Sequence, residues 1–439
     1  MVDGAAYCLS IDAELEAFRP EIEYVCDFLD SAYRLTRTVS ADRTLHYGRT
    51  ALEGAINIPA IFFPKFVTLE ADGLYLDRGN FDAWEADRTS AALMPPIGSG
   101  AKNGTMAYDA LGLVFFMLSR IEERGAASLD GYGRVSLNQS FAARIGRYAD
   151  PLADEAADQI AARLAGDSKP RHRDRFRIRL THDVDILKGY HQWYLPARYA
   201  LGDVLKRGAP RTALNRLRDA YFSGQPWRSF HEIMDGTERR GLKSSFYFMG
   251  PTSHAMDSPY AVHMADLLQH VSREVRSRGH EVGFHPGFET HADADEWMRQ
   301  KSGLESIVGQ EVRSGRQHVL RYHPEETPAI WEAAGMVRDE SLAFPEATGF
   351  RSGTCRPFHA YDLGNRRARS LVQCATAIME FGLFGGKYRD LSVDEALDDC
   401  RPAIDACRKY RGELVVLYHT GNQPPQVRTF YYRLLEQVA

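Results

Sequence analysis

The sequence predicts an α/β protein in which a mixed α/β domain at residues 1–170 precedes a (β/α) barrel at residues 171–439. Three observations lead to this prediction. The chain has 439 residues, which is more than a single hydrophobic core usually supports. From residue 175 onward, strand patterns alternate with helical patterns, as they do in parallel β/α units. Polar residues suited to catalysis follow several of the predicted strands, and barrels place their sites at strand ends.

The composition is that of an ordinary globular protein. Hydrophobic residues make up 44% of the chain, charged residues make up 26%, and the net charge is -5, so the concentrated basic face that nucleic acid requires is not expected. No apolar run is long enough to predict a membrane span. The acidic start MVDGAAYCLSIDAELEAF does not resemble an export signal. With six scattered cysteines, these features favour a reducing cytoplasm.

Three segments of the N-terminal part have clear patterns. Residues 58–76 place β-branched and aromatic residues around a Gly turn, which predicts short strands in a hairpin. Residues 108–124 have apolar residues at helical spacing and predict a buried helix, and residues 150–165 predict another. The charged segment 166–175 contains a Pro and marks the expected domain boundary. These patterns leave open whether the domain binds, regulates or simply caps the barrel.

The C-terminal part is expected to consist of β/α units. Predicted strands cover residues 176–181, 243–249, 281–284, 317–322, 371–377 and 413–418. Predicted helices cover residues 227–240, 259–278, 292–307, 325–334 and 393–408. About 265 residues in such units fit a barrel whose site lies at the C-terminal ends of the strands.

Two candidate motifs contain carboxylates and imidazoles. In Leu-Thr-His-Asp-Val-Asp, which ends the first strand, Asp183 and Asp185 are two residues apart. Strand side chains alternate, so both carboxylates project to one side and can share a cation; the alternative is that they cap the next turn. In Gly-His-Glu-Val-Gly-Phe-His-Pro, His285 follows a short apolar strand, and the next residue, Pro286, fixes the turn. His280 precedes that strand and is expected to be structural.

Two further motifs follow later strands. Arg316 and His318 share one face of a predicted strand, so a guanidinium and an imidazole can flank the same carboxylates. The alternative is a surface strand with solvated charges. The apolar residues Val319 and Leu320 argue against it. His419 is the first polar side chain after the apolar run Leu-Val-Val-Leu-Tyr. Its ordinary pKa of about 6.5 suits proton donation near neutrality.

The order of these motifs resembles that of the polysaccharide deacetylases, also called carbohydrate esterase family four. That family carries T-F-D-D-G, H-[ST]-x-x-H, R-x-P-Y and L-x-H in sequence. This chain has Thr-His-Asp-Val-Asp, then His285, then Arg316, then Leu-Tyr-His ending at His419. The motifs THDVD, GFHP, RQHVLRY and GFRSGTCRPFHAYD together resemble a divergent bacterial branch. The segment YDALGLVFFMLSRIEER resembles the N-terminal domain that accompanies that branch, and the resemblance implies a distorted barrel.

Residue by residue, the resemblance implies a catalytic role for three side chains. Asp183 matches the base that deprotonates water, Arg316 matches the arginine that orients the base, and His419 matches the general acid. His285 matches the first histidine of the metal site. Val184 stands where the family has its metal-binding Asp, so Asp185 is inferred to supply that ligand one residue later.

The third metal ligand has three candidates, because the family's second histidine is missing. Glu289 stands four residues after His285, and His291 follows two residues later. His318 is preferred, because it lies on a predicted strand and shares a face with Arg316. A set of one Asp and two His ligands fits zinc, for which cobalt or nickel can substitute.

The implied reaction is hydrolysis of an N-acetyl group on a carbohydrate, at a non-peptide carbon–nitrogen bond. Arg351, Arg356, Tyr361 and Asp362 are candidate substrate contacts, although Arg351 can equally pair with Asp362 to brace the loop. Another C–N bond or an O-acetyl ester would be cleaved by the same chemistry. A catalytically silent carbohydrate-binding protein is the alternative from a different class. The expected substrate is a cytoplasmic precursor of a surface polysaccharide.

Overall fold

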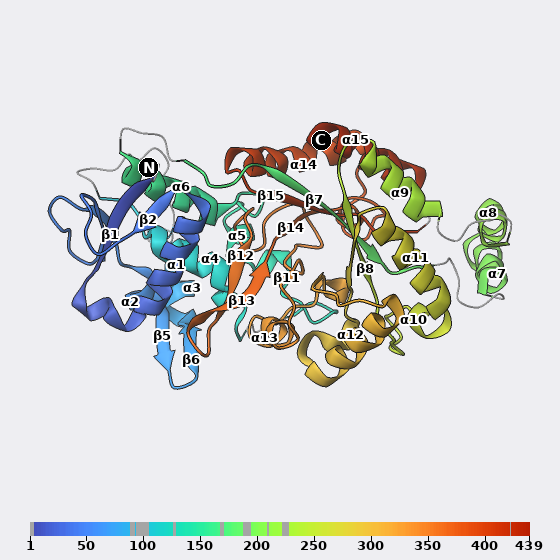
Figure 1. Ribbon diagram of the computed structural model, residues 1–439, viewed down its shortest axis with the longest axis horizontal. Coiled ribbons are helices and arrows are strands. Elements are labelled where there is room, and N and C mark those ends of the chain that lie inside the picture. The colour runs from blue at the N-terminus through green and yellow to red at the C-terminus, as the bar shows by residue number, and fades with distance from the viewer. Residues whose placement is uncertain are drawn as a thin grey trace.

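The structure is a computed structural model that describes residues 4–87, 93, 105–125, 129–166, 171–187, 195–208, 210–221, 228–421 and 423–439. Figure 1 shows the N-terminal part at one end of the long axis and the larger C-terminal part beside it. Each part contains its own sheet. No helix in the described ranges is long and apolar enough to cross a membrane.

The N-terminal part is built on a four-stranded parallel sheet with the order β2-β1-β3-β4. Its strands are β1 (Ala5–Ile11), β2 (Leu35–Arg37), β3 (Thr44–Gly48) and β4 (Ile56–Pro59). A separate antiparallel hairpin consists of β5 (Val67–Glu70) and β6 (Gly73–Leu76). The hairpin predicted within residues 58–76 is thus confirmed, and helix α2 (Phe62–Phe66) precedes it.

Two predicted helices of this part are confirmed as α4 (Ala110–Ser119) and α6 (Leu152–Ala165). Every residue of α4 is buried, as its continuous apolar sequence requires. The Asp109 side chain caps α4 by accepting a hydrogen bond from the Gly112 amide. The remaining helical segments are η1 (Ala13–Phe18), α1 (Arg19–Ala32), α3 (Arg78–Asp87), η2 (Ile121–Glu123), η3 (Leu137–Gln139) and α5 (Phe141–Arg144).

The C-terminal part contains a nine-stranded sheet with the order β12-β13-β11-β10-β9-β8-β7-β15-β14. Its strands are β7 (Arg177–Val184), β8 (Ser244–Phe248), β9 (Glu281–Phe284), β10 (Ser314–Gly315), β11 (Arg338–Asp339), β12 (Phe358–Asp362), β13 (Arg367–Gln373), β14 (Thr376–Met379) and β15 (Glu413–Leu417). All neighbouring strands are parallel except β12 and β13. This sheet confirms the predicted parallel β/α arrangement.

The sheet is curled. Strand β13 pairs with β11, whereas β14 pairs with β15 on the far side of the sheet. Only Cys374 and Ala375 separate β13 from β14 in the chain. Two residues span only a short distance, so the sheet must curve back until its two edges approach each other. The protein is therefore a mixed α/β fold with a curled sheet, and its likeness to a deacetylase barrel remains an expectation.

Helices cover the outside of the curled sheet. They are α9 (Arg228–Glu238), α10 (Tyr260–His263), α11 (Ala265–Ser277), α12 (Ala294–Val308), α13 (Glu326–Ala333), α14 (Val393–Lys409) and α15 (Pro425–Val438). Helices α7 (Leu195–Arg207) and α8 (Pro210–Tyr221) lie between β7 and α9 in the chain. Short turns η4 (Phe288–Ala292), η5 (His318–Leu320) and η6 (Glu380–Gly382) follow strand ends.

Three predicted elements differ from the structure. The predicted strand at residues 317–322 is wrong, because Val319 and Leu320 have left-handed backbones with φ of 49° and 60°, and the chain forms the turn η5 there. The predicted strand 371–377 comprises the end of β13 and the start of β14. The predicted helix 259–278 is broken at Met264, whose φ is -137°. Residue 227, the predicted start of α9, lies outside the described residues.

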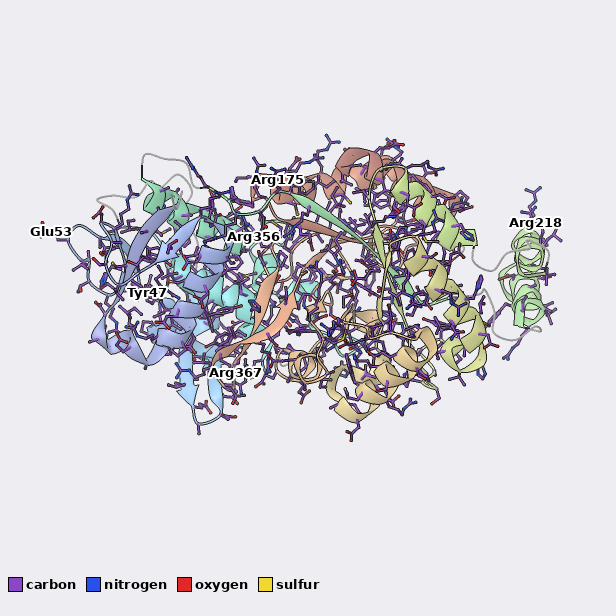
Figure 2. The ribbon with its side chains drawn as sticks, viewed as in Figure 1. Tyr47, Glu53, Arg175, Arg218, Arg356 and Arg367 are labelled. Atoms are coloured by element: carbon purple, nitrogen blue, oxygen red, sulfur yellow. The ribbon has the colours of Figure 1, made fainter. Side chains whose placement is uncertain are left out.

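The two parts of the chain share a hydrophobic cluster. Phe358, Tyr361 and Leu363 of the C-terminal part pack into the N-terminal core. Figure 2 shows Arg356 where the N-terminal helices meet the curled sheet, and its guanidinium pairs with Asp154 of α6 at 3.0 Å. Residues 167–170 of the expected boundary lie outside the described residues. The division of the chain near residue 170 therefore remains a prediction.

Candidate metal centre

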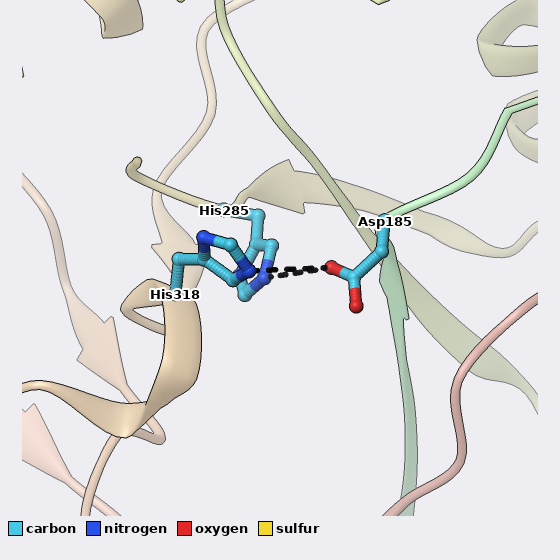
Figure 3. Close-up of side chains that lie close together, drawn as sticks. All are labelled: Asp185, His285 and His318. Carbon is cyan, nitrogen blue, oxygen red and sulfur yellow. Dashed lines mark ion pairs between the residues drawn. The ribbon is translucent and has the colours of Figure 1, made fainter. Parts of the chain in front are cut away.

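Three potential metal ligands gather at the C-terminal ends of the strands. Asp185 follows β7, His285 follows β9, and His318 lies in η5. One ligand atom from each lies within 4.8 Å of the other two. Nε2 of His285 is 3.3 Å from Oδ1 of Asp185, and Nε2 of His318 is 4.0 Å from the same oxygen. In Figure 3 both imidazoles point toward the Asp185 carboxylate.

Each imidazole uses Nδ1 for a hydrogen bond and leaves Nε2 available to bind a cation. Nδ1 of His285 lies 2.6 Å from the carbonyl oxygen of Arg316, and a carbonyl only accepts, so this nitrogen donates. Nδ1 of His318 lies 2.6 Å from a carboxylate oxygen of Asp257. In each neutral ring the Nε2 lone pair is therefore free for a metal, which is the arrangement that metal-binding histidines show.

Two buried atoms of this cluster lack a hydrogen-bond partner among the described residues: Nε2 of His285 and Oδ1 of Asp185. Buried polar atoms are normally satisfied, so their shared position fits a bound cation. Burial alone would raise the pKa of Asp185, but contact with His285 and the charges of His419, His285 and His318 hold it below its usual range. The cluster thus favours an ionised carboxylate, which is the ligand form a divalent metal binds.

Asp183 lies beside the cluster and is held by Arg316. Nη1 of the fully buried Arg316 donates to Oδ1 of Asp183 at 2.7 Å. Nη2 donates to the hydroxyls of Thr181 and Thr376 at 2.8 and 2.9 Å, and Nε donates to the carbonyl of Glu340. The second Asp183 oxygen, Oδ2, lies 3.8 Å from Nε2 of His285. Arg316 therefore fixes one oxygen of Asp183 while the other faces the centre.

His419 approaches from β15 and is held by a carboxylate. Nδ1 of His419 lies 2.6 Å from Oε1 of Glu380, which also accepts the His419 backbone amide at 3.1 Å. Burial lowers the pKa of His419, but Glu380 and the aspartates outweigh burial and raise it to about 10. Nε2 lies 3.8 Å from Oδ2 of Asp185. A protonated imidazole therefore points its second N–H toward the centre at neutral pH.

The structure brings together six of the residues selected from the sequence: Asp183, Asp185, His285, Arg316, His318 and His419. The other two candidates for the third ligand lie outside the group. Glu289 is largely exposed and pairs with His254 at 3.4 Å, and His291 is absent from the described ligand cluster. His318 occupies the expected position for a different reason from the one predicted, since it lies in a turn rather than on a strand.

The predicted substrate contacts need correction. Arg351 pairs with Glu123 at 2.9 Å, and Arg356 pairs with Asp154. The Tyr361 hydroxyl donates to Oε1 of Glu21 at 2.6 Å. All three side chains are buried against carboxylates of the N-terminal part, so they join the two parts instead of facing a substrate. The alternative pairing of Arg351 with Asp362 is also wrong, because Asp362 pairs with Arg369 at 2.8 Å.

Four charged residues that contact the candidate centre or its turn were missed from the sequence: Asp257, Glu380, Glu340 and Arg134. Glu380 directly follows β14, so the strand-end rule would have identified it had the predicted strand ended at residue 379. Asp257 lies in a loop, and Glu340 follows a strand of only two residues. Neither residue therefore stands next to a run of apolar residues long enough to predict a strand or a helix. Arg134 comes from the N-terminal part and donates to the carbonyl of Val319 at 2.7 Å.

Comparison with known proteins finds partial similarities. Residues 12–168 match a family described as "Family of unknown function (DUF7033)". No curated protein gives a significant match.

Three solved structures illustrate a similarity that covers 60% of this chain. A candidate polysaccharide deacetylase from Mycobacterium smegmatis is 17% identical, with a TM-score of 0.40 over 60% of this chain and 84% of that chain. The polysaccharide deacetylase Bc1974 from Bacillus cereus is 13% identical, with a TM-score of 0.31 over 60% and 86%. BA3943 from Bacillus anthracis, a CE4 family pseudoenzyme, is 12% identical, with a TM-score of 0.29 over 60% and 62%. Such values assign neither a reaction nor a ligand to this chain.

Proposed function

We propose that this protein is a metal-dependent hydrolase that removes an N-acetyl group from a sugar. The observation that carries the proposal is the cluster of Asp185, His285 and His318, whose ligand atoms lie within 4.8 Å of one another. Beside it, Asp183 and His419 each direct one polar atom toward the same point. The order of the sequence motifs supports a carbohydrate amide as the substrate.

The donor set favours zinc. One carboxylate and two imidazoles are borderline ligands, and a site with three protein ligands leaves a position open for chemistry. When bound, zinc supplies Lewis acidity that polarises a carbonyl and lowers the pKa of water. Asp257 and the Arg316 carbonyl orient the two imidazoles, which is the support that metal-binding histidines require.

Two residues of the chain move the protons. Asp183 accepts a proton from the attacking water through Oδ2, because Arg316 occupies its other oxygen. His419, held protonated by Glu380, donates a proton to the departing amine nitrogen. The acetyl C–N bond breaks, and acetate and a free amine leave. Positioned acid and base groups of this kind contribute rate factors of about 10² to 10⁴ each.

The proposed substrate is an N-acetylated sugar on a precursor of a surface polysaccharide in the cytoplasm. All six cysteines are free thiols, as is usual in a reducing compartment. Residues 1–170 are proposed to form an accessory domain packed against the catalytic domain, which comprises residues 171–439.

The test is acetate release from a panel of N-acetylated sugars, their nucleotide-linked forms and O-acetyl esters. Purified protein is stripped with chelator and reloaded with zinc, cobalt or nickel. We expect acetate from an N-acetyl substrate only after reloading, and loss of release in Asp185→Asn. Arg299→Ala, which removes an exposed pair with Glu296, serves as the control. Absence of bound metal together with no chelator effect would exclude the hydrolase and favour a silent binding protein.

A further inference from the structure

Helices α7 and α8 form a hairpin between β7 and α9. The two helices pack along each other, and Figure 1 shows them at one end of the long axis, outside α9 and α11. Ala200 and Asp203 of α7 and Ala213 of α8 are buried. These residues mark the inner faces of the hairpin, and the exposed aliphatic side chains among its described residues lie on other faces.

The outer face of α7 is apolar. Leu201, Val204 and Leu205 are 58%, 44% and 73% exposed. Their spacing of three and four residues places them on one face of the helix. A surface helix normally turns its apolar stripe toward the core, whereas α7 turns small and polar residues inward and large aliphatic residues outward. Leu214 of α8 adds another exposed aliphatic side chain, at 67%.

Cationic side chains border this apolar face. Arg198, Arg211 and Arg218 are exposed, and Figure 2 shows Arg218 directed away from the body of the protein. Residues 195–221 contain six Lys and Arg and two Asp, against a net charge of -5 for the whole chain. Asp203, the acidic residue whose side chain the structure describes in this hairpin, is buried. The hairpin is therefore a local basic patch on an acidic protein.

We propose that the hairpin docks this protein onto an anionic lipid bilayer. Helices with aliphatic side chains on one side and arginines around them lie in the interface of such bilayers, where both the buried apolar area and the lipid charge contribute. Two copies of the chain that met through this face would bring their arginines together, which is unfavourable. Because the rest of the chain is acidic, an anionic surface would attract the hairpin end and repel the remainder.

The experiment measures sedimentation of the full chain with vesicles of phosphatidylglycerol and phosphatidylcholine, and with phosphatidylcholine alone. We expect binding to the anionic vesicles that weakens as salt is raised, because screening shortens the range of charge attraction. The variant Leu201→Asp/Leu205→Asp should bind at least about tenfold more weakly. The variant Arg198→Glu/Arg211→Glu should lose the preference for anionic vesicles.

A matched control places the same charges elsewhere. Leu52 and Val262 are 43% and 54% exposed outside the hairpin, so Leu52→Asp/Val262→Asp should bind as the unmodified protein does. Equal binding to neutral vesicles, no vesicle binding, or unchanged binding of the Leu201→Asp/Leu205→Asp variant would overturn the proposal. So would a dimer in light scattering that this variant converts to monomer, since the face would then join two copies. The outcome is independent of metal loading and acetate release.

Discussion

At the scale of single residues, two aspartates of one motif differ because their partners differ. Asp183 accepts a hydrogen bond from the buried Arg316, whereas Asp185 faces His285 and His318. Both leave the same strand end, two residues apart, as alternation along a strand predicts. The proposed roles of base and ligand follow from these partners and not from the sequence spacing alone.

The Asp183→Asn variant tests this division. It keeps the shape of the side chain but removes the basic oxygen, so we expect kcat to fall by about 10² to 10⁴ while zinc content stays near that of the unmodified protein. Asp185→Asn should instead lose zinc. Metal analysis of both purified variants, with kcat measured on the best N-acetyl substrate, separates the roles. If Asp183→Asn lost zinc and Asp185→Asn retained it, the roles of base and metal ligand would have to be exchanged between the two residues.

Much of the centre could be predicted from residues at strand ends. Asp183, Asp185, His285 and His419 follow apolar runs whose strands the structure places within a few residues of the expected bounds. The partners of these side chains could not be predicted in this way. Asp257 is 61 residues from His318 in the chain, and tertiary contact alone brings the pair together.

At the scale of elements, the turn η5 illustrates what local pattern misses. The apolar pair Val319 and Leu320 suggested a strand, but both residues have positive φ, which costs a branched residue such as Val free energy. Such a conformation persists only where surrounding contacts impose it. Arg134 is one such contact: it donates to the Val319 carbonyl, and its guanidinium is held by Asp130 at 2.7 and 2.9 Å.

Arg134→Ala tests whether this contact positions His318. Without the donor, the strained turn is expected to relax. Because His318 directly precedes Val319 in this turn, the relaxation should displace the His318 imidazole from its position in the centre. We expect zinc affinity to fall by about 10- to 100-fold, the usual effect of removing support from a metal ligand, with the fold retained by circular dichroism. Competition with a chromophoric chelator measures the affinity. Arg147→Ala, which breaks pairs with Asp150 and Glu155 at 2.7 Å, is the control, and equal affinity of both variants would contradict the role of Arg134.

At the scale of the whole molecule, buried ion pairs join the two parts of the chain. Glu123 lies between Arg120 at 2.7 Å and Arg351 at 2.9 Å, and Glu21 and Asp154 pair with Arg366 and Arg356. The sequence indicated Arg351 and Arg356, in the motif GFRSGTCRPFHAYD, as candidate substrate contacts, with a bracing pair between Arg351 and Asp362 as the equal alternative. Arg351 and Glu123 are 228 residues apart, so no pattern in the local sequence reveals that they pair. The curl of the sheet, which follows from how β13 and β14 pair, has no local sequence pattern either.

The Glu123 pairs predict how stability depends on pH. Burial would raise the pKa of Glu123, but Arg120 and Arg351 outweigh burial and lower it from 4.5 to about 2. Because the folded-state pKa lies below the unfolded value, the contribution to stability is fully present above pH 4.5 and is lost as the pH falls toward 2. Glu123→Gln removes this titration and leaves two buried guanidinium groups short of a countercharge, which costs about 3–5 kcal/mol at neutral pH.

Urea unfolding of the unmodified protein and of Glu123→Gln at pH 7 and at successively lower pH measures the difference in free energy of unfolding. We expect the difference to be largest at neutral pH and to narrow below pH 4.5, the value at which Glu123 begins to bind protons in the unfolded chain. Glu155→Gln breaks a half-exposed pair with Arg147 and should cost no more than about 1 kcal/mol. A difference that stays constant between pH 7 and acid would mean that the Glu123 carboxylate does not hold the two parts together through its charge.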